Sequence, residues 1–150
     1  MLKNKKALVT GSSRGIGRKI VELFLANGAE VWGLCSRPSD ARGELEALAA
    51  EKGTAFHEIC ADCADAAALS ETVKAALSES GGFDVLVNNA GITKDGLSFR
   101  MKLEDWQKVL DINLTAVFVV SQIVSNDMIH RKSGSIINMT SIVGLHGGAG

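Results

Sequence analysis

The sequence predicts one domain of the α/β class over residues 1–150, with a doubly wound parallel sheet in a three-layer αβα arrangement. Two features predict this fold. Short apolar runs alternate with longer amphipathic segments along the chain, and the run at 83–88 is apolar in the manner of parallel strands buried on both faces. A chain of 150 residues can bury about 70% of its unfolded surface, which is enough for one core.

Three strand–helix units are predicted in the first half of the chain. The strands span 7–10, 30–35 and 54–61, and the helices span 15–27, 40–52 and 65–80. Apolar residues at helical spacing define the first helix, and the second is rich in Ala, Glu and Leu. The helices end at Asn27-Gly28, Gly53 and Gly81-Gly82, because glycine supports the left-handed turn that closes a helix.

The second half contains a fourth strand at 83–88, a long helix at 104–131 and a fifth strand at 135–140. Eight of the eleven residues from Leu114 to Val124 are apolar, whereas a helix on a sheet needs only one apolar stripe. We therefore expect a second buried face of this helix against a partner subunit in a homodimer, or in a homotetramer as the family resemblance given below implies. The alternative is that a later part of the same protein covers that face.

Charge gives limited information about partners. The formal net charge of −1 indicates neither a nucleic-acid nor a membrane partner. Residues 1–37 carry seven Lys or Arg against two Asp or Glu, whereas residues 38–91 carry three against ten. We expect the cationic excess to surround the first glycine-rich turn, where an anionic ligand would lie. A solvated basic face is the alternative interpretation.

Neither an export signal nor a membrane span is predicted. The amino terminus carries charge without a following apolar segment of signal-peptide length. The apolar-rich stretch at 114–124 is too short to cross a bilayer. We therefore expect a cytoplasmic protein.

Three cysteines, Cys35, Cys60 and Cys63, argue against a disulfide framework because their number is odd. Cys60 and Cys63 form a C-x-x-C motif. A zinc site would need two more ligands, and His57 is the only near candidate. A redox pair would need a thioredoxin-like setting. We expect no metal site and interpret the thiols as small buried side chains at a strand end.

A glycine-rich turn from Thr10 to Gly17, Thr-Gly-Ser-Ser-Arg-Gly-Ile-Gly, follows the first apolar run. Such a turn directs unpaired backbone N–H groups and the positive end of a helix dipole at one point, which suits a phosphate. The glycines permit a tight turn and a close approach of the backbone to a pyrophosphate. The backbone N–H of Ile16 should face the phosphates.

Four segments together resemble the short-chain dehydrogenase/reductase family, whose fold is Rossmann-like. They are the glycine turn, Asn88-Asn-Ala-Gly91 after the fourth strand, Asn113 within Asp-Ile-Asn-Leu-Thr, and Ser141 after the fifth strand. Within the family, the segments 91–97 and 100–106 are similar to those of 3-oxoacyl-acyl-carrier-protein reductases of fatty acid synthesis. The resemblance implies the reduction of a 3-oxoacyl thioester on acyl carrier protein.

The cofactor is predicted from the end of the second strand. NAD enzymes usually place an acid there for the ribose 2′-hydroxyl, but Cys35-Ser36-Arg37 contains none. Arg14, Ser36 and Arg37 could hold a 2′-phosphate, so we predict that NADPH binds at least about tenfold tighter than NADH. A solvated arginine is the alternative for Arg37.

The resemblance also assigns the other cofactor contacts. Asp62 would accept a hydrogen bond from the adenine amino group with the Cys63 N–H alongside, although Asp62 could instead cap the next helix, a role for which Asp65 competes. The cofactor-binding residues are thus predicted to be Gly11, Ser13, Arg14, Gly15, Ile16, Gly17, Ser36, Arg37, Asp62, Cys63, Asn88, Ala90 and Gly91. Asn89 is expected to tie neighbouring strands together.

By the same resemblance, Ser141 hydrogen-bonds the substrate carbonyl, and Asn113 holds a water of a proton relay at a local kink in its helix. A solvent-facing Asn113 is the alternative. The family's catalytic Tyr-x-x-x-Lys motif follows the serine, but this sequence contains no tyrosine and ends at Gly150. We therefore expect that the last strands and helices of the fold are missing and that the chain alone lacks useful reductase activity.

Two other functions stay open from the sequence. One is a different ketoreductase or alcohol dehydrogenase of the same family. The other is a non-catalytic fragment that binds a nucleotide or forms an oligomer, which the missing tyrosine favours.

Overall fold

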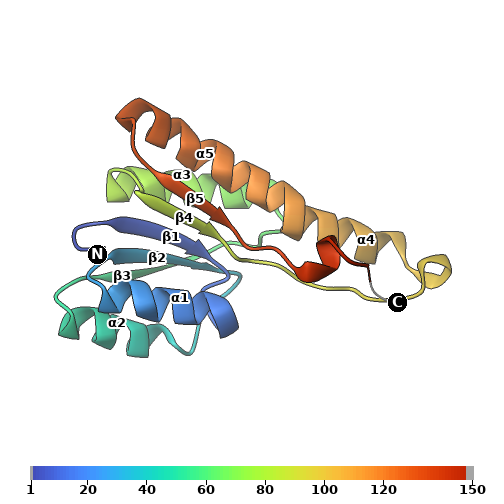
Figure 1. The fold of residues 1–150 in the computed structure, drawn as a ribbon, viewed down its shortest axis with the longest axis horizontal. Coiled ribbons are helices and arrows are strands. Elements are labelled where there is room, and N and C mark those ends of the chain that lie inside the picture. The colour runs from blue at the N-terminus through green and yellow to red at the C-terminus, as the bar shows by residue number, and fades with distance from the viewer. Residues whose placement is uncertain (1, 148–150) are drawn as a thin grey trace.

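The computed structural model describes residues 2–147 and forms three layers, with one parallel sheet between helices (Figure 1). The strands are β1 (Lys6–Thr10), β2 (Glu30–Cys35), β3 (Phe56–Cys60), β4 (Val85–Asn88) and β5 (Ser135–Asn138). Their order in the sheet is β3-β2-β1-β4-β5, and every neighbouring pair is parallel. The predicted doubly wound αβα fold is confirmed.

Helices cover both faces of this sheet. They are α1 (Gly15–Ala26), α2 (Arg42–Glu51), α3 (Ala66–Ser80), α4 (Leu103–Leu110) and α5 (Ala116–Arg131). Alternate residues of the central strand β1 enter two cores: Ala7 and Val9 pack toward α1 and α2, whereas Leu8 packs toward α3 and α5. Because both faces of β1 are buried, the strand is apolar without alternation.

Most element boundaries differ from the predicted ones by one or two residues. The third and fifth strands are shorter than predicted and end at Cys60 and Asn138, and Phe83 lies fully buried just before β4 rather than in it. Asp65 caps α3, since its carboxylate accepts hydrogen bonds from the N–H groups of Ala67 (3.1 Å) and Ala68 (3.0 Å). Two short 3₁₀ turns, Ser98–Arg100 and Ile142–Gly144, were not predicted.

The long predicted helix is continuous from Leu103 to Arg131, with a π-helical turn at Asp111–Thr115 between α4 and α5. The predicted apolar stretch at 114–124 is part of a 29-residue helix that, by length and composition alone, is long and apolar enough to cross a membrane. However, Ala116, Val120, Val124 and Met128 recur every four residues and pack into the core of the sheet.

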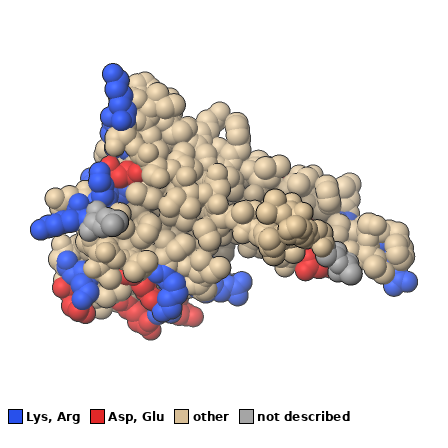
Figure 2. All heavy atoms as spheres, viewed as in Figure 1, with Lys and Arg blue, Asp and Glu red and all other residues tan. Residues whose placement is uncertain are grey.

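The other faces of this helix are open among the described residues. Leu114, Phe118 and Ile129 are 64%, 63% and 71% exposed, respectively. Figure 1 shows α4 extending beyond the carboxyl ends of the strands, and Figure 2 shows that this projecting part is mostly uncharged in the view drawn.

Candidate functional site

A pocket of about 550 Å³ lies at the carboxyl ends of the strands, where the chain after β1 crosses to β2 and the chain after β4 leaves in the opposite direction. Open α/β sheets bind ligands at such a switch point. Eleven of the thirteen predicted cofactor residues line this pocket: Gly11, Ser13, Arg14, Gly15, Ile16, Gly17, Ser36, Asp62, Cys63, Ala90 and Gly91.

Close backbone packing shapes the glycine turn. Gly11 has a φ of +70°, and a Cβ there would lie 2.9 Å from the Ala90 Cα. At Gly17 a Cβ would lie 2.1 Å from the Gly11 carbonyl oxygen. The Gly11 N–H donates to the Leu34 carbonyl oxygen at 2.8 Å, which joins the turn to the end of β2. The turn therefore leaves no space for side chains at these two positions.

The amino end of α1 is suited to an anion. Within residues 2–147, α1 has no side-chain cap and no acidic residue in its first turn, in contrast to α3 with its Asp65 cap. The first-turn N–H groups and the helix dipole thus meet no negative side chain. This end of the helix opens into the pocket, where Gly15, Ile16 and Gly17 form part of the wall.

The cationic excess of residues 1–37 does not surround the glycine turn as predicted. Lys5 lies 3.5 Å from Asp84 and Lys6 donates to the Ser80 carbonyl oxygen, both at the amino ends of the strands. Arg18 pairs with carboxylates of α1 and α2. Neighbouring carboxylates and carbonyls thus account for most of these charges.

Two arginines beside the pocket differ from this group. Arg14 lines the pocket, and Arg37 lies exposed in the loop after β2 without lining it. Among residues 2–147, no carboxylate lies within ion-pair distance of either guanidinium. Ser36, between Arg37 and β2, lines the pocket. Both arginines are therefore available to an anionic ligand.

At the end of β3, Asp62 and Cys63 form the opposite part of the pocket wall. The Asp62 carboxylate accepts a hydrogen bond from the Ala64 N–H at 2.9 Å, which closes a local turn. Burial, followed by the charge of Asp62, raises the pKa of the Cys63 thiol to about 11, so that side chain is neutral at pH 7. Of the three cysteines, Cys35 is buried as predicted and Cys63 is half-buried, but Cys60 is exposed.

Asn88 does not line the pocket. Its Nδ2 donates to the Ser121 Oγ at 2.9 Å and to the Asn138 Oδ1 at 2.8 Å, which joins β4 to α5 and β5. Asn89 lines the pocket instead, and its Nδ2 donates to the carbonyl oxygens of Thr10 (3.0 Å) and Gly11 (3.2 Å). The side chains of both residues hold strands together, a role that the sequence assigned to Asn89 alone.

Asn113 lies in the π-helical turn, so the helix is locally irregular at this residue. Its Oδ1 accepts from the Ile92 N–H at 2.9 Å, and its Nδ2 donates to the Ile92 carbonyl oxygen at 2.8 Å. The side chain is exposed but fixed by these two bonds. Asn113 therefore fastens the segment after Gly91 to the long helix.

Ser141 lies beyond β5 and does not line the pocket. Its Oγ accepts a weak hydrogen bond from the Val143 N–H at 3.4 Å. A hydroxyl that accepts in this way keeps its own hydrogen available for donation. Ser141 and Asn113 are both exposed, and the structure does not bring them into the cavity that holds the predicted cofactor residues.

Six lining residues were not predicted as cofactor contacts: Leu34, Cys35, Asn89, Ile92, Lys108 and Ile112. Lys108 and Ile112 come from α4 and the π turn, which lie far from the glycine turn in sequence. Their spacing of four residues, just before Asn113, was the available signal, because it places them on one side of a helix.

A larger hollow of about 790 Å³ lies on the outer side of α1, along Gly15, Ile16, Lys19 and Leu23. It is shallow, is formed by residues of this one helix, and lies away from the ends of β2, β3 and β4. The pocket at the strand ends draws on five separate segments, so we take that pocket as the functional site.

Comparison with known proteins identifies the family. The family model for short chain dehydrogenases matches residues 5–150. The chain is 43% identical over 150 residues to 3-oxoacyl-[acyl-carrier-protein] reductase FabG of Vibrio cholerae, which covers 99% of this chain and 59% of that protein. It is 44% identical to 3-oxoacyl-[acyl-carrier-protein] reductase of Synechocystis sp., with 96% of this chain and 58% of that protein covered.

A solved structure gives the same result. The crystal structure of a putative short-chain alcohol dehydrogenase from Sinorhizobium meliloti matches with a TM-score of 0.89 and 31% identity, over 99% of this chain and 58% of that one. The chain thus spans about 59% of the length of the curated relatives that it matches. The match to the family model over residues 5–150, together with the shared fold, shows that this chain belongs to the short-chain dehydrogenase family.

Proposed function

We propose that the protein reduces 3-oxoacyl thioesters carried on acyl carrier protein to 3-hydroxyacyl thioesters in fatty acid synthesis, and that this chain supplies its NADPH-binding part. The observation that carries the proposal is the pocket at the strand ends, with its uncapped helix and two arginines that have no carboxylate partner among residues 2–147. The names of the 40–45% identical relatives support the substrate.

The residues fit a dinucleotide phosphate. The volume of about 550 Å³ lies within the roughly 300–1,000 Å³ of ordinary ligand sites. The amides of Gly15 to Gly17 would bind the pyrophosphate, since they lie at the uncapped amino end of α1, and all three residues line the pocket. Arg14, Ser36 and Arg37 would bind the 2′-phosphate, and Asp62 would accept from the adenine amino group. Ala90 and Gly91 would flank the ribose.

When bound, NADPH supplies the hydride for the ketone. Ser141 would donate its hydroxyl hydrogen to the substrate carbonyl oxygen, and Asn113 would act as a positioning residue through Ile92. The sequence contains no tyrosine to give the proton. Because a positioned acid contributes roughly 10²–10⁴-fold to rate, we expect the 150-residue chain alone to bind NADPH without useful turnover.

The proposal is tested by titrating NADPH and NADH separately into the chain. We expect NADPH to bind at least about tenfold tighter, because each charge-assisted contact to a phosphate contributes about 1.5–3 kcal/mol. Arg14→Ala and Arg37→Ala should each weaken NADPH binding by about tenfold or more and leave NADH binding unchanged. Arg18→Ala is the matched control, since Arg18 pairs with Glu22 and Glu44 and lies outside the pocket.

Each result has a distinct meaning. Equal dissociation constants for the two cofactors would refute the assignment of the 2′-phosphate site. Binding of neither cofactor would refute the cofactor-binding function altogether. If a longer form of the protein that includes this chain acts on sugars or steroids rather than on thioesters, the alternative function is favoured. That alternative is another ketoreductase or alcohol dehydrogenase of the same family.

We also propose that the protein is a cytoplasmic homo-oligomer assembled through the helix Leu103–Arg131. The exposed apolar side chains of Leu114 and Phe118 support this assembly. The 3-oxoacyl-[acyl-carrier-protein] reductases among its relatives support a cytoplasmic location.

A further inference from the structure

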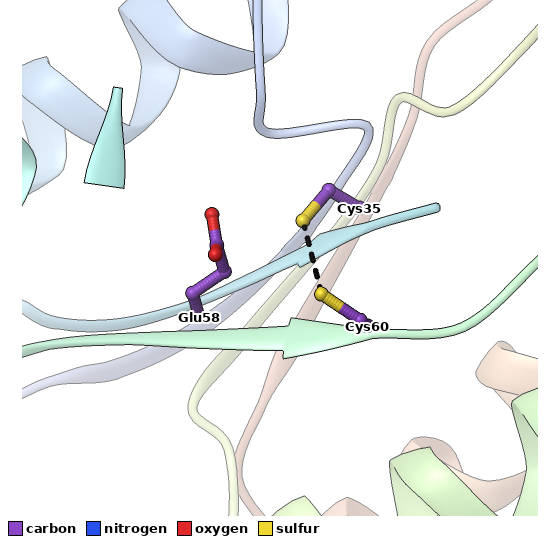
Figure 3. A group of neighbouring side chains, drawn as sticks. All are labelled: Cys35, Glu58 and Cys60. Atoms are coloured by element: carbon purple, nitrogen blue, oxygen red, sulfur yellow. Dashed lines mark hydrogen bonds between the residues drawn. The ribbon is translucent and has the colours of Figure 1, made fainter. Parts of the chain in front are cut away.

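Cys35, Glu58 and Cys60 form a cluster whose side chains are given no role in the proposed function, although Cys35 also lines the cofactor pocket. Figure 3 shows Glu58 and Cys60 on β3 with their side chains on the same side of the strand, and Cys35 on β2 with its sulfur directed at Cys60. The ligand atoms of the three residues all lie within 4.8 Å of one another. We propose that this cluster is a zinc site, in which two thiolates and one carboxylate bind the ion and a water completes the tetrahedron.

The distance between the two sulfurs favours a metal over a disulfide. Cys35 Sγ and Cys60 Sγ lie 3.7 Å apart. A tetrahedral zinc ion with Zn–S bonds of about 2.3 Å requires two sulfurs about 3.8 Å apart. A disulfide requires about 2.05 Å, so the sulfurs would have to move much closer. The thiols therefore already have the spacing of two zinc ligands.

Sheet geometry explains how three ligands meet. Cys35 and Cys60 are direct partners in the parallel register of β2 and β3. Glu58 lies two residues before Cys60, and residues two apart in a strand point to the same face. The C-x-x-C motif is not the ligand pair, because Cys63 lies beyond β3 and is not part of the group whose ligand atoms lie within 4.8 Å of one another. Zinc motifs are sought as spacings along the chain, which explains why the sequence did not reveal this pair.

The third ligand is already held in place. The Glu58 carboxylate accepts from the Ser39 N–H, at 3.3 Å to Oε1 and 3.1 Å to Oε2. Outer hydrogen bonds of this kind orient carboxylate ligands in metal sites. β3 is an edge strand and Cys60 is exposed, so an ion and its water can reach the cluster from solvent.

The charges balance on binding. Zinc binds thiolates, so the two thiols release two protons as the ion enters. The cluster carries one negative charge from Glu58 before binding, and two thiolates, a carboxylate and Zn²⁺ again sum to −1 afterwards.

The test is a titration of the reduced chain with Zn²⁺ alone, and with Co²⁺ as a spectroscopic substitute. We expect one zinc per chain, release of two protons per zinc in weak buffer, and a thiolate-to-cobalt charge-transfer band in the near ultraviolet. Cys60→Ser should weaken zinc binding by at least about 100-fold and weaken the band, because one of the two thiolates is lost and losing a ligand exceeds the 10–100-fold effect of an outer contact. Since Cys60 is exposed, this variant should fold.

Two further variants make the test specific. Cys63→Ser keeps both proposed sulfurs and should retain zinc binding and the cobalt band. Glu58→Gln keeps the shape but replaces the carboxylate ligand with a neutral amide, and should weaken binding by at least about 100-fold, as for the loss of any ligand. If Cys63→Ser loses the ion, or if Cys60→Ser still binds it with full affinity, the proposal is wrong.

An oxidative result would also overturn it. Hydrogen peroxide could convert the two thiols to a disulfide, with two waters as the other product. If the chain binds no zinc but forms a Cys35–Cys60 disulfide, seen as the loss of two hydrogens in the mass of the linked peptides, then the cluster is a redox pair. The zinc titration is carried out without NADPH, so its failure leaves the proposed function untouched.

Discussion

The absence of a side chain at Gly17 is required by the close packing of the glycine turn. A Cβ at this position would lie 2.1 Å from the Gly11 carbonyl oxygen and 2.5 Å from the Asn89 Nδ2, so the strand-end segments would have to separate. We expect Gly17→Ala to lower the free energy of unfolding by about 1–3 kcal/mol and to weaken NADPH binding. Chemical denaturation and cofactor titration measure the two effects.

Gly43 provides the matched control for this prediction. It lies in the first turn of α2, and among the described residues no atom lies within 4 Å of a Cβ built there. Gly43→Ala should therefore leave the stability unchanged or raise it by up to about 1 kcal/mol. Equal stability of the two variants would contradict the packing argument.

The two asparagines after β4 show what the sequence does and does not reveal about single residues. The position of the Asn88-Asn-Ala-Gly91 motif at a strand end predicted its place at the pocket, and Asn89, Ala90 and Gly91 do line it. The sequence did not predict that the Asn88 side chain turns away, to Ser121 and Asn138. Those partners lie 33 and 50 residues away, and no local pattern carries such information.

At the level of elements, the π turn joins the long helix to the pocket through Asn113. Asn113→Ala removes both hydrogen bonds to Ile92, so we expect a loss of about 1–3 kcal/mol in unfolding free energy. Asn113→Asp keeps an acceptor for the Ile92 N–H but no donor for its carbonyl. Amide hydrogen exchange of Ile92 should be fast in the alanine variant and protected in the aspartate variant. Unchanged exchange in Asn113→Ala would show that the segment is held by other contacts.

The open face of the same helix carries a prediction about assembly. Phe118 is 63% exposed in the chain, and Phe118→Arg should shift an oligomer toward monomers, because a charge opposes burial in an apolar interface. Leu23→Arg is the control, since Leu23 is 61% exposed on the separate helix α1. Sedimentation velocity distinguishes the species. If Phe118→Arg leaves the assembly intact, another surface holds the subunits together.

The long helix also shows why elements are easier to predict than their details. Its apolar periodicity gave both ends to within one residue, since α4 begins at Leu103 and α5 ends at Arg131. The π turn was expected only as a local kink, from a poor helix former at Asn113. Its form depends on Ile92, a residue outside the helix.

For the molecule as a whole, Asp84 joins β1, β4 and α5 at the amino ends of the strands. Its carboxylate accepts from the Lys6 N–H at 3.0 Å and lies 3.5 Å from both the Lys5 Nζ and the Arg131 guanidinium. Burial would raise the pKa of Asp84, but this hydrogen bond and these charges outweigh it and hold the pKa below its ordinary value of 3.8. The folded chain thus favours the carboxylate.

The sign of the pH dependence follows from this lowered pKa. The stability contributed by Asp84 is fully present above its unfolded pKa and is lost as the pH falls through the lower folded pKa. Asp84→Asn should therefore be less stable at neutral pH and show a weaker loss of stability below about pH 4. Glu51→Gln is the control, because among residues 2–147 Glu51 pairs with the exposed Lys52 alone, and such pairs contribute little. Parallel pH dependences of wild type and Asp84→Asn would contradict this role.

The fold was more predictable than the site because alternation of strands and helices is a local property of the sequence. The layers and the parallel sheet followed from that alternation and are confirmed. The charge balance of residues 1–37 gave a wrong prediction of where the cations lie. Lys5 and Lys6 lie at the start of β1, whereas Arg14 lies beyond its far end. Residues just before a strand and residues just after it lie at opposite ends of the sheet, and a count of charges along the sequence does not reveal this.

The two ends of the strands therefore have different roles in this protein. Asp84 and Arg131 form an ion pair at the amino ends of the strands, whereas the glycine turn and its neighbours line the pocket at the carboxyl ends. Additional ion pairs or hydrogen bonds between β1, β4 and α5 at this end should therefore stabilise the protein without changing the shape of the pocket. The free energy of unfolding and the ligand specificity can then be changed by separate sets of substitutions.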